Sequence, residues 1–174
     1  SDGPGLTYTL VSTTNANGVV TITNASTGAY SYTPAANYYG PASFTFQASD
    51  GTATSNIATV NITITADNDA PVAVNDAATV SEGGTVSVLT GGATSVFAND
   101  TDPDSTPTLV TFTPASNGTV NVNPDGTFSY THNGSETTSD SFTYTITDGP
   151  SSSTATVSIT ITAVNDAPVA INDA

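Results

Sequence analysis

Apolar and polar residues alternate along most of the chain, in short runs that turn residues separate. In Ser141–Thr147, for example, Phe142, Tyr144 and Ile146 take every second position, and Thr or Ser lies between them. A period of two is typical of β-strands with one face in a core and the other in water. No stretch has the 3.6-residue period of an amphipathic helix. The pattern therefore predicts an all-β protein.

Seven strands are predicted between residues 71 and 163. Gly, Pro, Asn and Asp mark their ends, and the second strand is expected to place Val86 and Val88 inward. The predicted runs are Pro71–Asn75 with Ala78–Ser81 (a split first strand), Thr85–Leu89, Thr108–Thr113, Thr119–Val122, Thr127–Thr131, Ser141–Thr147 and Ala155–Ala163. Seven strands in about 100 residues are typical of an immunoglobulin-like Greek-key sandwich.

The pattern repeats with a period of about 97 residues, the interval from Asp69 to Asp166. The stretch Asp67-Asn68-Asp69-Ala70-Pro71 returns as Asn165-Asp166-Ala167-Pro168, and VNITITA returns as VSITITA. We therefore predict tandem units. Residues 1–66 are the C-terminal part of one sandwich, 67–70 an acidic hinge, 71–163 a complete sandwich, and 164–174 the hinge and first strand of the next unit.

The first unit is predicted to have five strands and to lack the first two. Its runs are Leu6–Leu10, Gly18–Thr23, Ala29–Thr33, Ser43–Ala48 and Ile57–Thr65. Such a remnant exposes its core and its sheet edges. The missing strands either precede it in a longer parent chain or come from a neighbouring molecule. Pro168–Asp173 is a candidate donor strand for end-to-end assembly.

The composition limits the classes of partner. The 174 residues include 15 Asp and Glu and no Lys or Arg, so the formal charge is −15. Nucleic-acid binding needs Lys and Arg against phosphates, and no apolar run is long enough to insert into a membrane. The apolar fraction of 36% and the regular alternation argue against disorder. The counter-charges that remain for these carboxylates are metal cations.

Catalysis is poorly supported by the residue types present. The chain has no Cys to act as a nucleophile and no Lys or Arg to stabilise an oxyanion. His132 is the only histidine, in what the pattern suggests is a polar loop, and no Ser-His-Asp order completes a triad around it. We therefore expect a protein that is not an enzyme.

The alternating strand directions assign the acidic loops to two ends of the complete unit. The top, where the chain enters, receives the hinge Asp67-Asn68-Asp69 and the turns that follow later strands. The bottom receives Glu82, Glu136 and the next hinge. The top residues are Asp67, Asn68, Asp69, Asp100, Asp102, Asp104, Asp125 and Asp148, and the bottom ones are Glu82, Glu136, Asn165 and Asp166.

Calcium suits this chemistry, because Ca²⁺ takes six to eight oxygen ligands from carboxylates and carbonyls. Mg²⁺ demands stricter geometry, and zinc or copper sites need softer ligands. Two like charges about 4 Å apart repel by about 1 kcal/mol in water and about 4 kcal/mol at an effective dielectric of 20. The joint is therefore predicted to be mobile without metal and rigid with it. Asp-Gly pairs are also ordinary turn formers, so both interpretations stay open for Asp50 and Asp125.

These motifs resemble those of cadherins. DNDAPVA (67–73) is similar to the cadherin interdomain linker, NDTDPD (99–104) resembles the paired-aspartate calcium motif, and Glu82 lies where cadherins place a glutamate after the first strand. The closer likeness is to bacterial cadherin-like repeats, which occur in tandem in giant secreted adhesins and biofilm proteins. The chain departs from the pattern in its bottom loop, where Glu136 and Asp140 replace a clear acidic motif. The first unit also lacks a counterpart of Glu82.

The resemblance implies an extracellular, calcium-rigidified extender of an adhesin or biofilm surface protein. It implies neighbouring repeats as partners. The predicted Ca²⁺ ligands are Asp67, Asn68, Asp69, Glu82, Asp100, Asp102, Asp104, Asp148, Asn165 and Asp166. One alternative is a filament or surface-layer subunit assembled by strand exchange. The other is a carbohydrate-binding module that uses Tyr38 and Tyr39 on surface glycans, with Tyr30 and Tyr32 in the core.

Overall fold

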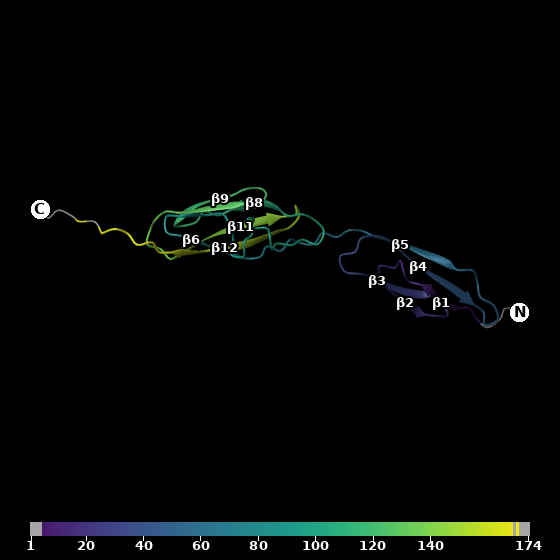
Figure 1. Ribbon diagram of the computed structural model, residues 1–174. Coiled ribbons are helices and arrows are strands. Elements are labelled where there is room, and N and C mark those ends of the chain that lie inside the picture. Colours follow the sequence, from purple (N-terminus) through teal and green to yellow (C-terminus); the bar gives the residue numbers. More distant parts are fainter. Residues whose placement is uncertain (1–4, 169, 171–174) are drawn as a thin grey trace. The chain divides into compact units, whose positions relative to one another are not determined.

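The computed structural model describes residues 5–168 and residue 170. The chain divides into two compact units, Ser1–Asp67 and Asn68–Ala174, and most of their strands are labelled in Figure 1. Every regular element among the described residues is a β-strand. This confirms the prediction of an all-β protein.

The second unit is a sandwich of two sheets. One sheet has the order β6-β12-β11-β8 and the other β7-β10-β9. All neighbours are antiparallel except β6 and β12, which are parallel. The strands are β6 (Asp76–Ser81), β7 (Thr85–Val86), β8 (Thr108–Phe112), β9 (Gly118–Val122), β10 (Phe128–His132), β11 (Ser139–Thr147) and β12 (Ser152–Thr162). The predicted seven-stranded sandwich is confirmed.

The core lies between these sheets, where the alternation of β11 and β12 places it. Phe142, Tyr144 and Ile146 are at most 1% exposed, and Val157, Ile159 and Ile161 are at most 4% exposed. The prediction for the second strand is partly wrong. Pairing ends at Val86, and Val88 is 42% exposed while Leu89 is buried. The alternation stops because the chain leaves the sheet toward Gly91 and Gly92, which both have positive φ.

The first strand is split, as the sequence predicts. Its second part, β6, runs beside β12. In its first part, Val72 forms an isolated bridge with Thr101 in the long acidic loop. The amides of Val72 and Thr101 donate to each other's carbonyls at 2.8 and 3.1 Å. This bridge places the hinge beside the loop that carries the paired aspartates.

The first unit has five strands in two sheets, β1-β4-β5 and β2-β3. They are β1 (Thr7–Ser12), β2 (Gly18–Asn24), β3 (Ala29–Pro34), β4 (Gly40–Ser49) and β5 (Ala58–Ile64). Among residues 5–67 there is no counterpart of β6 or β7. Three hydrophobic residues of this part are buried, Ala16, Ala42 and Phe44, against fourteen in the core of the second unit. The proposed donor strand Pro168–Asp173 lies mostly outside the described residues.

Candidate metal sites at the two ends of the second unit

The hinge residues Asn68 and Asp69 are attached to the unit that follows them. Pro71 is buried, and the Val72–Thr101 bridge holds the chain directly after it. The side-chain amide of Asn68 donates to Asp148 Oδ2 at 2.8 Å, and the backbone N–H of Asp69 donates to Asp104 Oδ2 at 3.2 Å. The hinge, the acidic loop and the turn after β11 therefore meet. We call Asn68, Asp69, Asp102, Asp104 and Asp148 the top cluster.

The loop carboxylates of the top cluster are arranged by local turns. Asp102 accepts hydrogen bonds from the backbone N–H groups of Asp104 and Ser105, at 3.0 and 2.8 Å. The N–H of Ser151 donates to Asp148 Oδ1 at 2.7 Å. The hydroxyl of Ser105 also donates to Asp102 Oδ2 at 2.9 Å, so both carboxylate oxygens of Asp102 hold its loop, whereas Asp148 uses one. The carboxylate oxygens keep further lone pairs that can bind a cation.

Like charges are close together in the top cluster. The N–H of Asp69 lowers the pKa of Asp104, but the side chain of Asp102 and the charges of Asp102 and Asp69 outweigh it, so the pKa of Asp104 is raised. For Asp102, burial opposes ionisation, but the hydrogen bonds from Asp104 and Ser105 outweigh it and lower the pKa. A cation among these groups would relieve the repulsion.

Asp100 has a different environment, although it was predicted together with Asp102 and Asp104. Its carboxylate oxygens lie 3.0 and 3.1 Å from the hydroxyl of the buried Tyr144, and Asp100 Oδ1 also accepts the N–H of Val74 at 2.8 Å. Asp76 Oδ2 lies 3.2 Å from the same hydroxyl. Asp100 therefore ties the acidic loop and the split first strand to the core.

This Tyr144 network concentrates negative charge. Burial raises the pKa of Asp76, and the negative charge of Asp100 raises it further. Hydrogen bonds from Tyr144 and Asn99 lower this pKa but do not outweigh the other two influences. Burial also raises the pKa of Asp100, and burial and both carboxylates raise that of Tyr144. The hydroxyl of Tyr144 has one proton for both carboxylates and for the carbonyl of Val96, which lies 2.7 Å away. Asp76 was missed by sequence reasoning, and the adjacent pair Asn75-Asp76 at a strand start was the available signal.

A second acidic group lies at the bottom of the unit. Carboxylate oxygens of Glu82, Glu136 and Asp166 lie within 4.8 Å of one another, and we call these three residues the bottom cluster. Glu82 is half-buried and the other two are exposed. The charge of Glu82, followed by Asp166, raises the pKa of Glu136. The sequence analysis placed Glu136 at this end but did not include it among the predicted Ca²⁺ ligands.

Local structure brings the bottom cluster together. The N–H of Glu82 donates to Thr162 at the end of β12, and Val164 N–H donates to Glu82 Oε2 at 3.1 Å. The chain that leaves β12 is therefore held against the turn after β6. Asn165 lies outside the cluster, and its amide donates to the backbone of Asp166.

His132 connects the two loops of the bottom cluster. It is 3% exposed, within β10, and not in a polar loop as the sequence suggested. Its Nδ1 accepts the N–H groups of Gly83 and Gly134 at 3.1 and 3.3 Å. Its Nε2 lies 3.0 Å from Thr137 Oγ1. Since Nδ1 accepts, Nε2 carries the proton. One neutral imidazole thus holds the neighbours of both Glu82 and Glu136.

Asp140, the other acidic residue of the bottom loop, has a structural role. Its carboxylate accepts the N–H groups of Ser116 and Asn117 at 3.1 and 2.8 Å, and the hydroxyl of Tyr130 at 2.9 Å. Burial opposes its ionisation, but these hydrogen bonds and that of Ser141 outweigh burial and lower its pKa. It joins β11 to the loop before β9.

Asp67, Asp50 and Asp125 are the remaining candidates from the sequence. Asp67 is exposed and ends the first compact unit. Asp50 accepts the N–H groups of Thr52 and Ala53, and Asp125 accepts the N–H and hydroxyl of Thr127. These contacts explain Asp50 and Asp125 as turn formers.

The donors of both clusters are oxygens only. They come from Asp, Glu and Asn side chains, and no Lys or Arg exists anywhere in the sequence to neutralise them. Hard oxygen donors in flexible loops suit Ca²⁺. Zinc sites mostly use thiolate and imidazole ligands, and neither cluster contains these. The residues present therefore fit a calcium ion.

The model of the bacterial cadherin-like domain matches residues 68–163, more than half of the chain. The chain belongs to this family. A model of the bacterial Ig domain matches residues 1–63. The resemblance inferred from the hinge and the acidic loop is thus confirmed. Cadherin-like domains generally bind calcium, are typically extracellular and are typically not enzymes.

Several solved structures are similar to this cadherin-like chain, and the one with a TM-score of 0.50 supports its fold. Human protocadherin-24 EC1-2 is 14% identical with a TM-score of 0.50, and the match covers 96% of this chain and 84% of that one. The insect immune protein hemolin is 13% identical with a TM-score of 0.44, over 91% of this chain and 39% of that one. An endo-fucoidan hydrolase of glycoside hydrolase family 107 is 22% identical with a TM-score of 0.33, over 94% and 24%. At these identities the likeness concerns the fold alone.

No curated protein matches the chain. The described residues include no helix with the length and apolar character needed to cross a membrane. The two family-model matches place the chain among adhesion-type repeat modules.

Proposed function

We propose that these units are calcium-rigidified spacers of an extracellular bacterial adhesin or biofilm surface protein, which hold a distal binding module away from the cell. The observation that carries the proposal is the bottom cluster. Glu82, Glu136 and Asp166 come from three separate segments, yet their carboxylates converge within 4.8 Å without a cationic partner. Convergence of like charges is unfavourable unless a cation offsets it.

The top cluster supports the same interpretation. In a tandem array, the bottom of one unit and the top of the next flank the same hinge. The second unit carries acidic residues at both ends, so each end would supply ligands to one joint. Calcium held by Asn68, Asp69, Asp102, Asp104 and Asp148 would fix the hinge to the unit that it introduces. The calcium ion would have a mechanical role: its positive charge would hold the carboxylates of the joint together and stiffen it. No catalytic step is involved.

The glycan-binding alternative has weaker support. Tyr39 is 59% exposed, but Tyr38 is half-buried and its hydroxyl donates to the carbonyl of Pro41. Two adjacent rings therefore do not present one open platform. The filament alternative would depend on strand exchange, and its discriminator is calcium-dependent self-assembly.

Calcium titration tests the proposal directly. The chain would be followed by calorimetry and small-angle scattering, in excess chelator and then in millimolar Ca²⁺, with Mg²⁺ as the comparison ion. We expect a higher Tm and a longer, less variable maximum dimension with Ca²⁺, because ligand binding to the folded state stabilises it. An unchanged Tm and dimension would rule out the spacer mechanism.

A further inference from the structure

Three Asn-Gly pairs occur in the sequence, at 17–18, 117–118 and 133–134. An asparagine before glycine can lose its side-chain amide when the backbone nitrogen of the glycine attacks the side-chain carbonyl carbon, because glycine has no Cβ to obstruct the succinimide ring that forms. The rate depends on the room around the glycine, on the group that removes its proton and on the group that stabilises the carbonyl oxygen. The structure gives the three pairs different surroundings.

The pair Asn133-Gly134 has room for this ring. It lies in the loop between β10 and β11, and both residues are exposed. Gly134 has a φ of 79°, and a Cβ built on it would meet nothing within 4 Å. The backbone at Gly134 is therefore not crowded by other parts of the unit.

A base contacts the nitrogen that would attack. The N–H of Gly134 donates to His132 Nδ1 at 3.3 Å. Since Nε2 carries the ring proton and lies 3.0 Å from Thr137 Oγ1, the lone pair of Nδ1 faces this N–H and that of Gly83, at 3.1 Å. The N–H that must lose its proton is thus already in contact with a group that can take it.

The side chain that would be attacked is held by a hydrogen-bond donor. The N–H of Ser135 donates to Asn133 Oδ1 at 3.0 Å. This bond keeps the amide group on the C-terminal side of Asn133, where the Gly134 nitrogen lies. The same N–H would stabilise negative charge that develops on Oδ1, as donors of an oxyanion hole do. Base, attacking nitrogen and oxyanion donor thus belong to one short segment.

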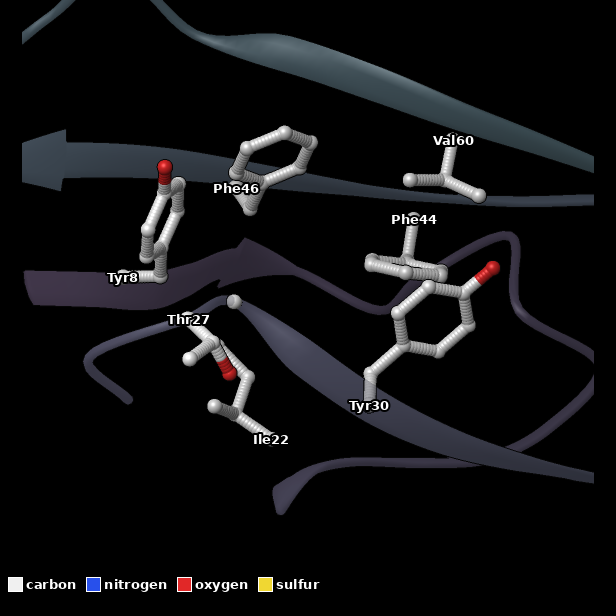
Figure 2. Close-up of a pocket in the computed structure, with 8 residues that line it drawn as sticks. Tyr8, Ile22, Thr27, Tyr30, Phe44, Phe46 and Val60 are labelled. Atoms are coloured by element: carbon white, nitrogen blue, oxygen red, sulfur yellow. The ribbon is translucent and has the colours of Figure 1, made fainter. Parts of the chain in front are cut away.

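The other two pairs lie in packed strands. Gly118 begins β9 and Gly18 begins β2. A Cβ on Gly118 would lie 2.6 Å from the carbonyl oxygen of Thr131, and one on Gly18 would clash with the backbone of β3. β2 is also held by side chains, and Figure 2 shows its Ile22 with Tyr30 of β3 among those that line an apolar pocket. Ring closure is hindered at both glycines.

We propose that Asn133 is a site of spontaneous deamidation, with His132 as the base. His132 Nδ1 takes the proton of Gly134, whose nitrogen forms a bond to Asn133 Cγ while the N–H of Ser135 stabilises Oδ1. The bond from Cγ to the side-chain nitrogen then breaks, and ammonia leaves with the proton that His132 returns. Water opens the succinimide at either carbonyl and leaves aspartate or isoaspartate at position 133.

The modification changes the loop that also carries Glu136. Either product adds one negative charge to this loop, and isoaspartate also adds a methylene group to the backbone. Since each step uses only residues 132–135 and water, the reaction does not depend on calcium or on the proposed spacer function.

Deamidation of all three pairs can be followed in the full chain, in chelator at neutral pH, with and without denaturing urea. Mass spectrometry of chymotryptic fragments gives the fraction converted at each pair, because the chain has no Lys or Arg for trypsin. We expect Asn133 in the folded chain to react at least about tenfold faster than Asn17 and Asn117, since general base catalysis typically contributes about 10²–10⁴-fold. In urea the three rates should become similar. If Asn133 reacts no faster in the folded chain than in urea, the proposal is wrong.

His132→Asn separates the base from a simple hydrogen-bond acceptor. An amide oxygen near the place of Nδ1 can accept the N–H of Gly134 but cannot take its proton. The rate at Asn133 should fall to its value in urea while that at Asn17 stays the same, with thermal unfolding used to verify that the variant folds. A rate at Asn133 equal to that of the unaltered chain would overturn the role of His132.

Gly134→Ala tests the succinimide route and keeps His132. Its Cβ meets open space in the folded loop but obstructs ring closure. We expect much slower conversion of Asn133 and no isoaspartate, which an isoaspartyl methyltransferase detects in the unaltered chain. Aspartate formed at an unchanged rate would mean direct hydrolysis of the amide by water and would contradict the proposal.

Discussion

The side-chain amide of Asn68 donates a hydrogen bond of 2.8 Å to the carboxylate of Asp148, which lies eighty positions later in the chain. The first residue belongs to the hinge and the second to the turn after β11. Together with the contact between Asp69 and Asp104, it attaches the hinge to the unit that follows. Calcium is therefore expected to strengthen an existing attachment.

Asp104→Asn tests the top cluster. The change removes one charge and one strong ligand from a group whose like charges raise the pKa of Asp104. We expect calcium affinity at this end to fall at least tenfold, because a neutral amide is a weaker Ca²⁺ ligand than a carboxylate. Isothermal titration measures it. Asp50→Asn, at a turn of the first unit, is the matched control and should leave the affinity unchanged.

Glu136→Gln tests the bottom cluster through its pH dependence. Glu82 and Asp166 raise the pKa of Glu136 in the folded chain, so the metal-free protein should gain stability as the pH falls through that raised pKa toward the unfolded value. Calcium binding should weaken over the same range, because protons compete for the carboxylate. In Glu136→Gln, both the stability of the metal-free protein and the calcium affinity should depend less on pH. If the pH dependence of both is unchanged, Glu136 is not part of the cluster.

Asp140→Ala tests a structural carboxylate. The variant leaves the N–H groups of Ser116 and Asn117 and the hydroxyl of Tyr130 without their acceptor. We expect a loss of about 2 kcal/mol in the free energy of unfolding. Since the pKa of Asp140 is lowered in the folded state, its contribution is complete above the unfolded pKa and disappears as the pH falls through the folded one. Denaturant unfolding at pH 7 and pH 3 should show the difference, and calcium affinity should not change.

His132→Phe separates loop positioning from ligation. The variant keeps an aromatic ring, although a larger one, and the N–H groups of Gly83 and Gly134 lose their acceptor, which costs about 1–3 kcal/mol of stability. Because these glycines flank the loops of Glu82 and Glu136, calcium affinity at the bottom should fall several-fold while that of the top cluster stays the same. Equal losses at both ends would indicate general unfolding instead.

Gly126→Ala and Gly134→Ala form a matched pair. Both glycines have a φ near +80°, a conformation that costs an L-residue about 1–2 kcal/mol. A Cβ on Gly126 would lie 2.6 Å from the ring of Phe97, whereas one on Gly134 meets open space. Thermal unfolding should therefore show a larger loss for Gly126→Ala, by about 1–3 kcal/mol for the added overlap.

The strands and the core face could be predicted because a period of two is a direct consequence of strand geometry. The alternation of Phe142, Tyr144 and Ile146 needed no further information. The error at Val88 arose where the chain leaves the sheet, because alternation says nothing beyond the last hydrogen-bonded pair. Such an exit depends on the loop that follows, here one with two glycines at positive φ.

The acidic residues were harder to assign, because the residue type does not tell where a side chain points in an irregular loop. Asp100 and Asp102 are two positions apart, yet the first faces the hydroxyl of Tyr144 and the second holds its own turn. Glu136 and Asp140 belong to the same segment, yet one lies in the bottom cluster and the other caps backbone amides. These differences are set by tertiary partners that no local pattern encodes.

The parallel pairing of β6 with β12 determines how the second unit would respond to tension. The first and last strands of the unit run side by side over six residue pairs, from Asp76 with Val157 to Ser81 with Thr162. A pull on the two ends of the unit draws these strands in opposite directions along their length. Their hydrogen bonds are then loaded in shear and must break together, whereas bonds loaded as in a zipper would break one after another. This fold is therefore suited to carry load along the chain.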